Sequence, residues 1–415
     1  MPGLYGEGFY GGGLYGEGGV YAPTTWPLET LQLAFGYGPK DVIPSAAWIS
    51  MANRARSLTT TRTRSDELER YDSFSASTTL SNLDGYLTPE NSASPYDVGP
   101  STPFLYTLNG NVTYYGFTSG FPQTYPDYVD ATVNLTALDR LSLLNRRKFG
   151  AGATFAQAFS GQRFYDVLVT NLGYDAADVD LDAGTVTCDV TADLIGTNPL
   201  DHLQTIALAE GGRFFASKDG KFTFRDRSSC LVGLLAKQGT FGNEDDTQIP
   251  FRLVNDEIPQ DASKIYNGVH ITDSTGGVYD VEDVASQDAY GELDYNETWP
   301  VLAGDAQMRG GHILEDRKDP HLRIPALEII HTRNPTVCQP IINALEIGQL
   351  FGFRFQPLAP GSDLISMDVV VDGITIDSSP GEFHVTVQLS PADTRQYWLL
   401  ELPGYTGLEL TTNLY

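Results

Sequence analysis

Alternation of apolar and polar residues with a period of two, broken by tight turns, constrains this chain more than any other feature of its sequence. In "EFHVTVQL", from Glu382 to Leu389, every second residue is apolar, and "ATVNLTAL", from Ala131 to Leu138, repeats the pattern. Because side chains of a strand alternate between its two faces, both stretches predict half-buried strands. The residues expected to face a core are Phe383, Val385, Val387 and Leu389, and Val133, Leu135 and Ala137.

Residues typical of tight turns and of helix ends occur elsewhere in the chain. Asn109-Gly110, Asp219-Gly220 and Asp372-Gly373 each predict a hairpin, since such dipeptides accept the positive φ of tight turns. A helix is expected to begin at Pro199, capped by Asn198, and to stop at Gly211-Gly212. A second helix is expected over 305–317.

The length of 415 residues is too great for one core and indicates several domains. With 42 Gly and 24 Pro, the composition is typical of a mainly β protein rich in turns. We expect a mainly β fold in which two β domains flank a small α+β insert of one helix and a hairpin. The expected domains are a Gly/Tyr-rich arm and linker (1–50), a first β domain (51–150), the α+β insert (151–235), a second β domain with one helix (236–402) and a C-terminal tail (403–415).

The charge of the chain limits its partners. The formal net charge is -27, from 53 acidic and 26 basic residues. Since nucleic-acid binding depends on Lys and Arg displacing counterions, tight DNA binding is not expected. A negative wall would instead let a polyanion slide past without adhering. No basic and apolar leader and no long apolar run occur, so we expect a protein made in a cytoplasm with no membrane-spanning segment.

The N-terminus carries a false nucleotide motif. "GEGFYG", Gly6 to Gly11, fits the dinucleotide fingerprint, but no strand can precede it and no helical period follows. "GLYGEG" occurs at Gly3 and again at Gly13, so the stretch is a ten-residue repeat of glycine and aromatic residues. Residues 1 to 25 are therefore interpreted as a low-complexity arm that is disordered alone or held against a partner.

Candidate sites for chemistry are weak. Asp178, Asp180, Asp182 and Asp189 match four EF-hand positions, but Ala183 replaces the required glycine, which favours a solvated acidic turn over a calcium loop. The other candidates are His312, His321 and His331, whose spacing fits no metal motif, and Cys188, Cys230 and Cys338, which fit neither a disulfide framework nor a zinc pair. No G-x-S-x-G occurs. We expect no catalytic residues, no cofactor and no metal ligands.

Several segments together resemble the tail-hub or minor tail proteins of long-tailed bacteriophages with flexible tails. "TLSNLDGYLTPENSASPY" (Thr79 to Tyr96) resembles the opening of that family's first barrel, with Leu87 where an aromatic residue is usual. The further matches are "ATVNLTALDRLSLL", "NPLDHLQTIALAEGGRFFASKDGKFTFRDR", "KIYNGVHIT", "ASQDAYGE" and "VQLSPADTRQYWLLE". They follow in family order over residues 53 to 402, and the Gly/Tyr repeats resemble minor tail proteins of actinobacterial phages.

The resemblance implies a passive part of a virion tail tip, assembled in the host cytoplasm. Related hubs carry two tail-tube-like β-barrel modules per chain, so that a homotrimeric ring presents six modules to a six-fold tube. The implied partners are further copies of the chain, the distal tail protein, the tape-measure protein and other tail-tip or receptor-binding proteins. Genomic DNA would pass through the channel without specific binding.

Two alternatives stay open. One is the distal tail protein itself, a six-copy ring adaptor that also carries a tube-like barrel. The other is a virion-borne carbohydrate-binding or hydrolytic protein that uses an unrecognised carboxylate pair, for which Asp245 and Glu282 are examples of residues to replace.

Overall fold

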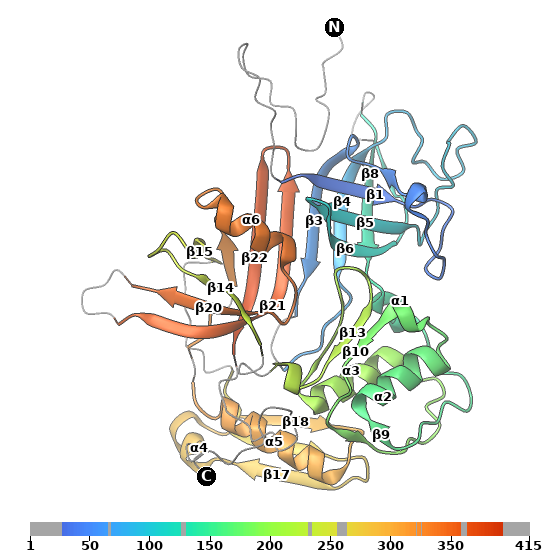
Figure 1. Ribbon diagram of the computed structural model, residues 1–415. Helices are drawn as coiled ribbons and strands as arrows, with labels where there is room; N and C mark the ends of the chain where they lie inside the picture. The colour runs from blue at the N-terminus through green and yellow to red at the C-terminus, as the bar shows by residue number, and fades with distance from the viewer. Residues whose placement is uncertain are drawn as a thin grey trace.

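A computed structural model describes residues 27–64, 68–125, 130–230, 235–254, 264–320, 322–324, 326–357 and 363–392. The described chain forms one 14-stranded sheet, an α+β unit below it and a small three-stranded sheet with its own helices (Figure 1). The expected arm of residues 1 to 25, with Gly6 to Gly11, and the C-terminal tail lie outside the described residues.

The strands are β1 Glu29–Leu33, β2 Ile49–Ser50, β3 Ala55–Arg62, β4 Ser75–Ser81, β5 Pro103–Leu108, β6 Asn111–Thr118, β7 Gln123–Thr124, β8 Thr132–Leu138, β9 Ala158–Phe159, β10 Val179–Leu181, β11 Thr187–Cys188, β12 Arg213–Ala216, β13 Phe222–Arg225, β14 Lys237–Phe241, β15 Phe251–Leu253, β16 Gly268–Thr272, β17 Val278–Glu282, β18 Asp294–Thr298, β19 Ala326–Ile329, β20 Leu350–Phe355, β21 Ile365–Ser379 and β22 Glu382–Pro391. The α-helices are α1 Leu141–Asn145, α2 Ser160–Tyr165, α3 Pro199–Glu210, α4 Val284–Tyr290, α5 Ala303–Arg317 and α6 Pro335–Ala344.

The first β region contains β1 to β8, and the hairpin and the strand predicted there are confirmed. The hairpin between β5 and β6 turns at Asn109 and Gly110, whose φ angles are 51° and 78°. Val133, Leu135 and Ala137 of β8 are buried as predicted. Residues 27–50, expected to belong to the arm and linker, contribute β1 and β2, and β1 pairs with β5 in the large sheet.

The predicted hairpin at Asp372-Gly373 is wrong. Strand β21 runs through both residues, and its register with β22 shifts between Val371 and Gly373, as at a β-bulge. The chain turns instead after Ser379, where Gly381 has a φ of 89°. Strand β22 then returns with the four predicted apolar residues buried. A bulge accepts the same small and polar residues as a turn, so the dipeptide alone does not separate the two.

The α+β unit follows its sequence signals closely. The Asn198 side chain accepts a hydrogen bond from Leu200 N, Pro199 opens α3, and Gly211 ends it with a φ of 72°. Strands β12 and β13 form the hairpin predicted at Asp219-Gly220. Phe164, Phe214 and Phe224 fill a core that is separate from that of the large sheet.

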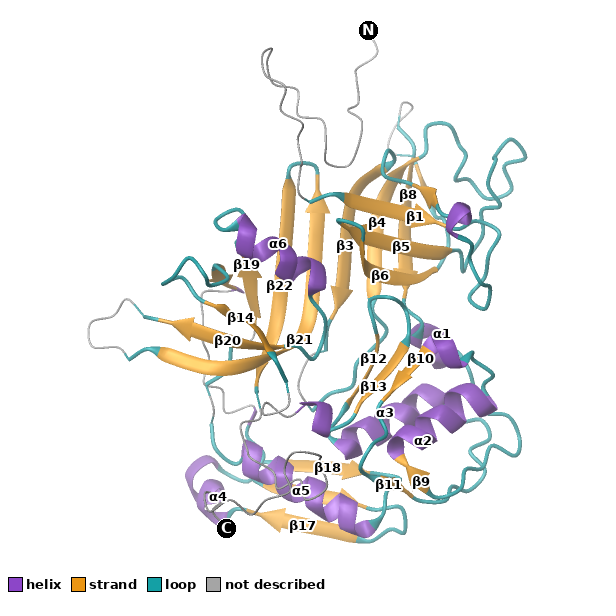
Figure 2. Ribbon diagram, in the orientation of Figure 1, coloured by secondary structure: helices purple, strands orange, loops and turns teal. Residues whose placement is uncertain are grey.

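The small sheet has the order β17-β16-β18 and lies at the end of the molecule farthest from β1 (Figure 2). Helix α5 confirms the helix predicted over 305–317. It packs on Val269 and Ile271 of β16 in a third core that also buries Trp299. The second β region thus contains α4, α5 and α6 in place of the single expected helix.

The expected fold class is confirmed, because the described chain is mainly β with an α+β unit between two β regions. The described strands do not form closed barrels, however. β3 pairs with β21, so both regions belong to one open sheet, ordered β15-β19-β22-β21-β3-β4-β8-β6-β5-β1-β2, and they share one hydrophobic core.

Candidate functional site

The most heavily constrained polar site is a buried cluster of charges where the large sheet meets the α+β unit. Asp372 lies at the bulge of β21, Arg64 follows β3, and Arg213 opens β12, so three distant parts of the chain meet there. The side chains of Arg64 and Asp372 are only 5% and 7% exposed. Buried charges require partners, so this contact fixes how the three elements sit together.

Asp372 accepts most of the contacts in this cluster. Its Oδ1 atom lies 2.8 Å from Arg64 Nη2 and 3.5 Å from Arg213 Nε. The Tyr71 hydroxyl donates to the same oxygen at 3.2 Å, and the Arg64 guanidinium lies over the Tyr71 ring. Burial alone would raise the pKa of Asp372, but the charges of Arg64 and Arg213 outweigh it and the pKa is lowered. The carboxylate is therefore held in its charged form.

The bulge explains why glycine follows Asp372. A Cβ atom on residue 373 would lie 2.6 Å from Thr63 Cγ2, so no larger side chain fits against β3 there. The close approach of the two strands brings Asp372 within reach of Arg64. Gly373 is thus required by packing between strands and not by a turn.

A second ion pair, between Arg62 and Glu346, connects β3 and the β12–β13 hairpin to the second β region. Arg62 Nη2 lies 2.5 Å from Glu346 Oε1 and also donates to the Ala216 carbonyl at 3.3 Å. The other oxygen of Glu346 accepts from Lys218 N at 3.1 Å. Arg62 of β3 therefore contacts the β12–β13 hairpin at Ala216, and Arg213 of the same hairpin contacts Asp372 of β21.

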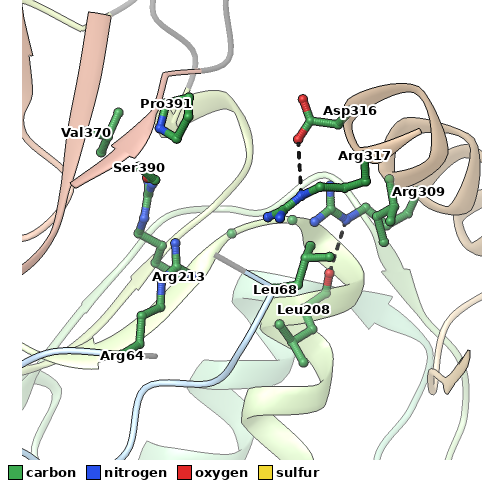
Figure 3. Close-up of a pocket in the computed structure, with 13 residues that line it drawn as sticks. Arg64, Leu68, Leu208, Arg213, Arg309, Asp316, Arg317, Val370, Ser390 and Pro391 are labelled. Carbon is green, nitrogen blue, oxygen red and sulfur yellow. Dashed lines mark hydrogen bonds and ion pairs between the residues drawn. The ribbon is translucent and has the colours of Figure 1, made fainter. Parts of the chain in front are cut away.

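A cavity of about 110 Å³ opens beside Arg64 and Arg213, the two cations of the Asp372 cluster (Figure 3). Arg64, Arg213, Ser390 and Pro391 line one side of it. Helix α5 contributes the opposite side with Ile313 and the charged residues Arg309, Asp316 and Arg317. Arg309 Nε donates to the Leu208 carbonyl at 3.3 Å, near the end of α3. The cavity thus marks the place where the large sheet, the α+β unit and the small-sheet unit meet.

This arrangement is suited to holding parts together and not to proton transfer. The contact of Arg213 with Asp372 crosses from the α+β unit to the large sheet, and Asp372 is kept ionised by the charges of Arg64 and Arg213. Buried ion pairs of this kind specify one arrangement of elements, because any shift leaves a charge buried without its partner.

The structure does not gather the aspartates of the predicted acidic loop around one point. Asp178 pairs with Arg140 at 2.6 Å, whereas Asp180 and Asp182 both pair with Arg225. Residues 179–181 form strand β10 in place of a loop. Asp189 lies beyond β11, where its Oδ2 accepts from the Ser274 hydroxyl.

The other candidate residues are also dispersed. The His312 ring is 3.2 Å from Arg227, and His331 is 3.0 Å from the Phe383 carbonyl, while His321 lies outside the described residues. Cys188 and Cys338 are buried free thiols, and burial raises the pKa of Cys188 to about 12. Asp245 accepts from Thr247 N in a loop, and Glu282 ends β17 in another unit.

The residues of the Asp372 cluster were not predicted from the sequence. Arg64, Arg213 and Asp372 are separated by more than a hundred residues along the chain, and each is ordinary in its local context. The one available signal was the Asp-Gly pair inside the apolar run "DVVVDGITID", which was interpreted as a turn. A polar pair within an otherwise continuous strand pattern also indicates a bulge.

Comparison with known proteins gives a likeness of fold. No protein-family model and no curated protein matches the chain. Among solved structures, the 43 kDa tail protein of prophage MuSo2 from Shewanella oneidensis is similar, with a TM-score of 0.54 and 13% identity over 88% of this chain and 99% of that one. The tail protein from Neisseria meningitidis MC58 has a TM-score of 0.54 and 10% identity over 88% of this chain and 97% of that one.

These likenesses cover nearly the whole of both tail proteins, so the shared feature is the complete arrangement of units and not one common domain. At such low sequence identity, the comparison shows a shared fold alone. None of the described helices is both long and apolar enough to cross a membrane.

Proposed function

We propose that this chain is a structural component of a bacteriophage tail, a hub at the tail tip that joins the tube or distal tail protein to the parts below it. The observation that carries the proposal is the fold shared with two tail proteins, one of them from a prophage, over almost their entire length. The Gly/Tyr repeats of the N-terminus favour an actinobacterial phage type. We place the protein in the virion, at the tail tip.

The internal construction supports a structural role. A tail part must keep its shape while neighbouring proteins pull on it, and here two β regions share one sheet and one core. The α+β unit is attached to that sheet by the ion pairs of Asp372 and Glu346. Two β regions per chain favour a hub, in which three chains present six modules, over a six-copy distal ring.

The net charge of -27 supports a channel that DNA passes without binding. We propose that further copies of the chain, the distal tail protein, the tape-measure protein and other tail-tip proteins are its partners. This role requires no catalysis, and we propose that the chain is not an enzyme. Turnover of cell-wall glycans or peptides that is lost in Asp245→Asn or Glu282→Gln would favour the hydrolytic alternative instead.

Symmetry-resolved electron microscopy of the intact particle tests the proposal. Three copies of this chain around the tail axis, with acidic residues along the channel, are the expected result. Six copies would identify the distal ring. Density for the chain outside the tail, or a channel wall formed by its Lys and Arg residues, would refute the tail-channel role.

A further inference from the structure

The small sheet has one face that stays exposed in the described chain. Helix α5 packs on the face that carries Val269 and Ile271, and Figure 2 shows this helix lying over the strands. Side chains alternate along each strand, so Val278 of β17 belongs to the opposite face together with Asp280. Val278 is 58% exposed, and the side chain of Asp280 is 60% exposed. A partner can therefore reach this side of the sheet.

The exposed face is acidic. Asp280 and Glu282 of β17 lie on it, and the pairing of β16 with β18 adds Asp294, whose side chain is 51% exposed. The three strands contribute one histidine to this face, His270, which lies between Asp280 and Asp294. Over residues 265–308 the sequence has nine Asp or Glu residues and no Lys or Arg. This acidic face, defined by Asp280, Glu282 and Asp294, is complementary to a basic surface.

A basic surface of this kind lies elsewhere in the same chain. Arg146, Arg147 and Lys148 follow one another directly after α1, which ends at Asn145. Arg146 and Lys148 are exposed, and neither forms an ion pair with a carboxylate of the described chain. Arg147 donates to the Leu172 carbonyl at 3.2 Å, which holds this basic segment against the α+β unit. Two of its three cations therefore point their charge at no group of their own copy.

One copy of the chain does not bring these two surfaces together. Helix α1 lies where the large sheet meets the α+β unit, whereas the small sheet lies at the end of the molecule farthest from β1 (Figure 1). Two copies can join the surfaces in a heterologous contact, and such contacts close into a ring when their rotation returns to the first copy. Copies that each carry a net charge of -27 repel one another in general, so a contact that pairs unlike charges is favoured over others.

We propose that the acidic face of one copy binds the basic segment 146–148 of the next copy. Arg146 and Lys148 meet the carboxylates of β17, and the exposed Val278 becomes buried in the same contact. Charge pairs at an interface select the partner and fix the register, and they can be coupled more strongly than pairs on an open surface. The inference rests on the proposed hub, because a ring of copies requires a contact between two different surfaces of the chain.

Sedimentation equilibrium of the full chain, at concentrations up to about 0.1 mM, tests the contact. We expect the wild type to self-associate in this range. Reversal of the basic segment in Arg146→Glu/Lys148→Glu should weaken the association at least about tenfold, because like charges then face each other. Reversal of the acidic face in Asp280→Lys/Glu282→Lys should have the same effect. A chain that combines all four changes should associate again, since unlike charges meet once more.

Lys40→Glu/Arg333→Glu is the matched control. Both residues are exposed, and neither pairs with a carboxylate of the described chain, so this variant changes the net charge as much as reversal of the basic segment does. It should associate as the wild type does. Carbodiimide joins an amine to a carboxylate, so in a mixture of isotope-labelled and unlabelled wild type it should link Lys148 of one copy to Asp280 or Glu282 of another. Circular dichroism should confirm that every variant keeps its fold.

Three results would overturn the inference. The first is a wild type that stays monomeric over the whole range, which would leave the tail role to be decided by the copy number in the particle. The second is a loss in the control variant as large as that in Arg146→Glu/Lys148→Glu, which would indicate a general effect of net charge. The third is a folded four-change chain that associates no better than either double variant. A dimer that both reversals disrupt would support the contact and contradict the three-copy hub.

Discussion

Asp139 should make the stability of the protein depend on pH near neutrality. It follows β8 and precedes α1, so it lies where the first β region passes into the α+β unit, and it is 1% exposed. Its Oδ1 accepts from Leu141 N at 3.0 Å, whereas its Oδ2 has no hydrogen-bond partner among the described residues. The charged or titratable groups that face it are Arg62 of β3 and Tyr114 of β6.

The magnitude follows from the pKa. Burial raises the pKa of Asp139 from 3.8 to about 7, because the backbone hydrogen bonds and the charge of Arg62 only partly offset the lost hydration. The folded state therefore holds the proton more tightly than the unfolded chain. This contributes stability below about pH 4 that is lost as the pH rises through about 7. At about 1.4 kcal/mol per pKa unit, the contribution is about 4 kcal/mol, of which about 3 kcal/mol is lost between about pH 5 and pH 8.

Urea denaturation of wild type and Asp139→Asn across this pH range measures the effect. The asparagine cannot ionise, so the free energy of unfolding of the variant relative to the wild type should rise by about 3 kcal/mol from about pH 5 to pH 8. Asp377→Asn, which changes an exposed aspartate of β21, is the control and should run parallel to the wild type. Parallel curves for wild type and Asp139→Asn would refute the assignment of a buried neutral carboxyl group.

Three further predictions concern the Asp372 cluster, helix α3 and the N-terminal arm. Asp372→Asn should lower the free energy of unfolding, measured by urea denaturation, by about 3 to 5 kcal/mol, because it leaves Arg64 and Arg213 buried beside a neutral group. A loss below about 1 kcal/mol would contradict the structural role given to the cluster. Asn198→Ala should cost about 1 kcal/mol through the lost cap of α3, and an unchanged urea midpoint would show that the cap is dispensable. Deletion of residues 1 to 22 should leave the melting temperature of the isolated protein nearly unchanged, since glycine-rich sequence forms no core, and a large drop would show that the arm is part of the fold.

The two Asp-Gly pairs show where local reasoning succeeds and where it fails. Asp219-Gly220 turns a hairpin as predicted, and Gly220 has a φ of 83°. Asp372-Gly373 lies in the middle of a strand, where its carboxylate meets Arg64 and Arg213. The dipeptide permits a turn in both places, and only long-range contacts decide whether it forms one.

Features that depend on neighbouring residues were predicted, and features that depend on distant residues were not. Period-two alternation was sufficient to place the inward residues of β8 and β22, and cap residues placed α3, because these signals act between neighbours in the chain. The pairing of β3 with β21 was not predicted, and it turns two expected barrels into one open sheet. The cluster around Asp372 depends on such pairings.

The sequence by itself determined the mainly β class, the α+β unit, the ends of α3 and the acidic surface. Each of these depends on composition or on residues a few positions apart, so the physical cause lies within a short stretch of chain. The tertiary structure alone decided which strands meet and which charges are buried. Those outcomes depend on the register between strands far apart in sequence, and register is set by the packing of the whole sheet and not by any one segment of it.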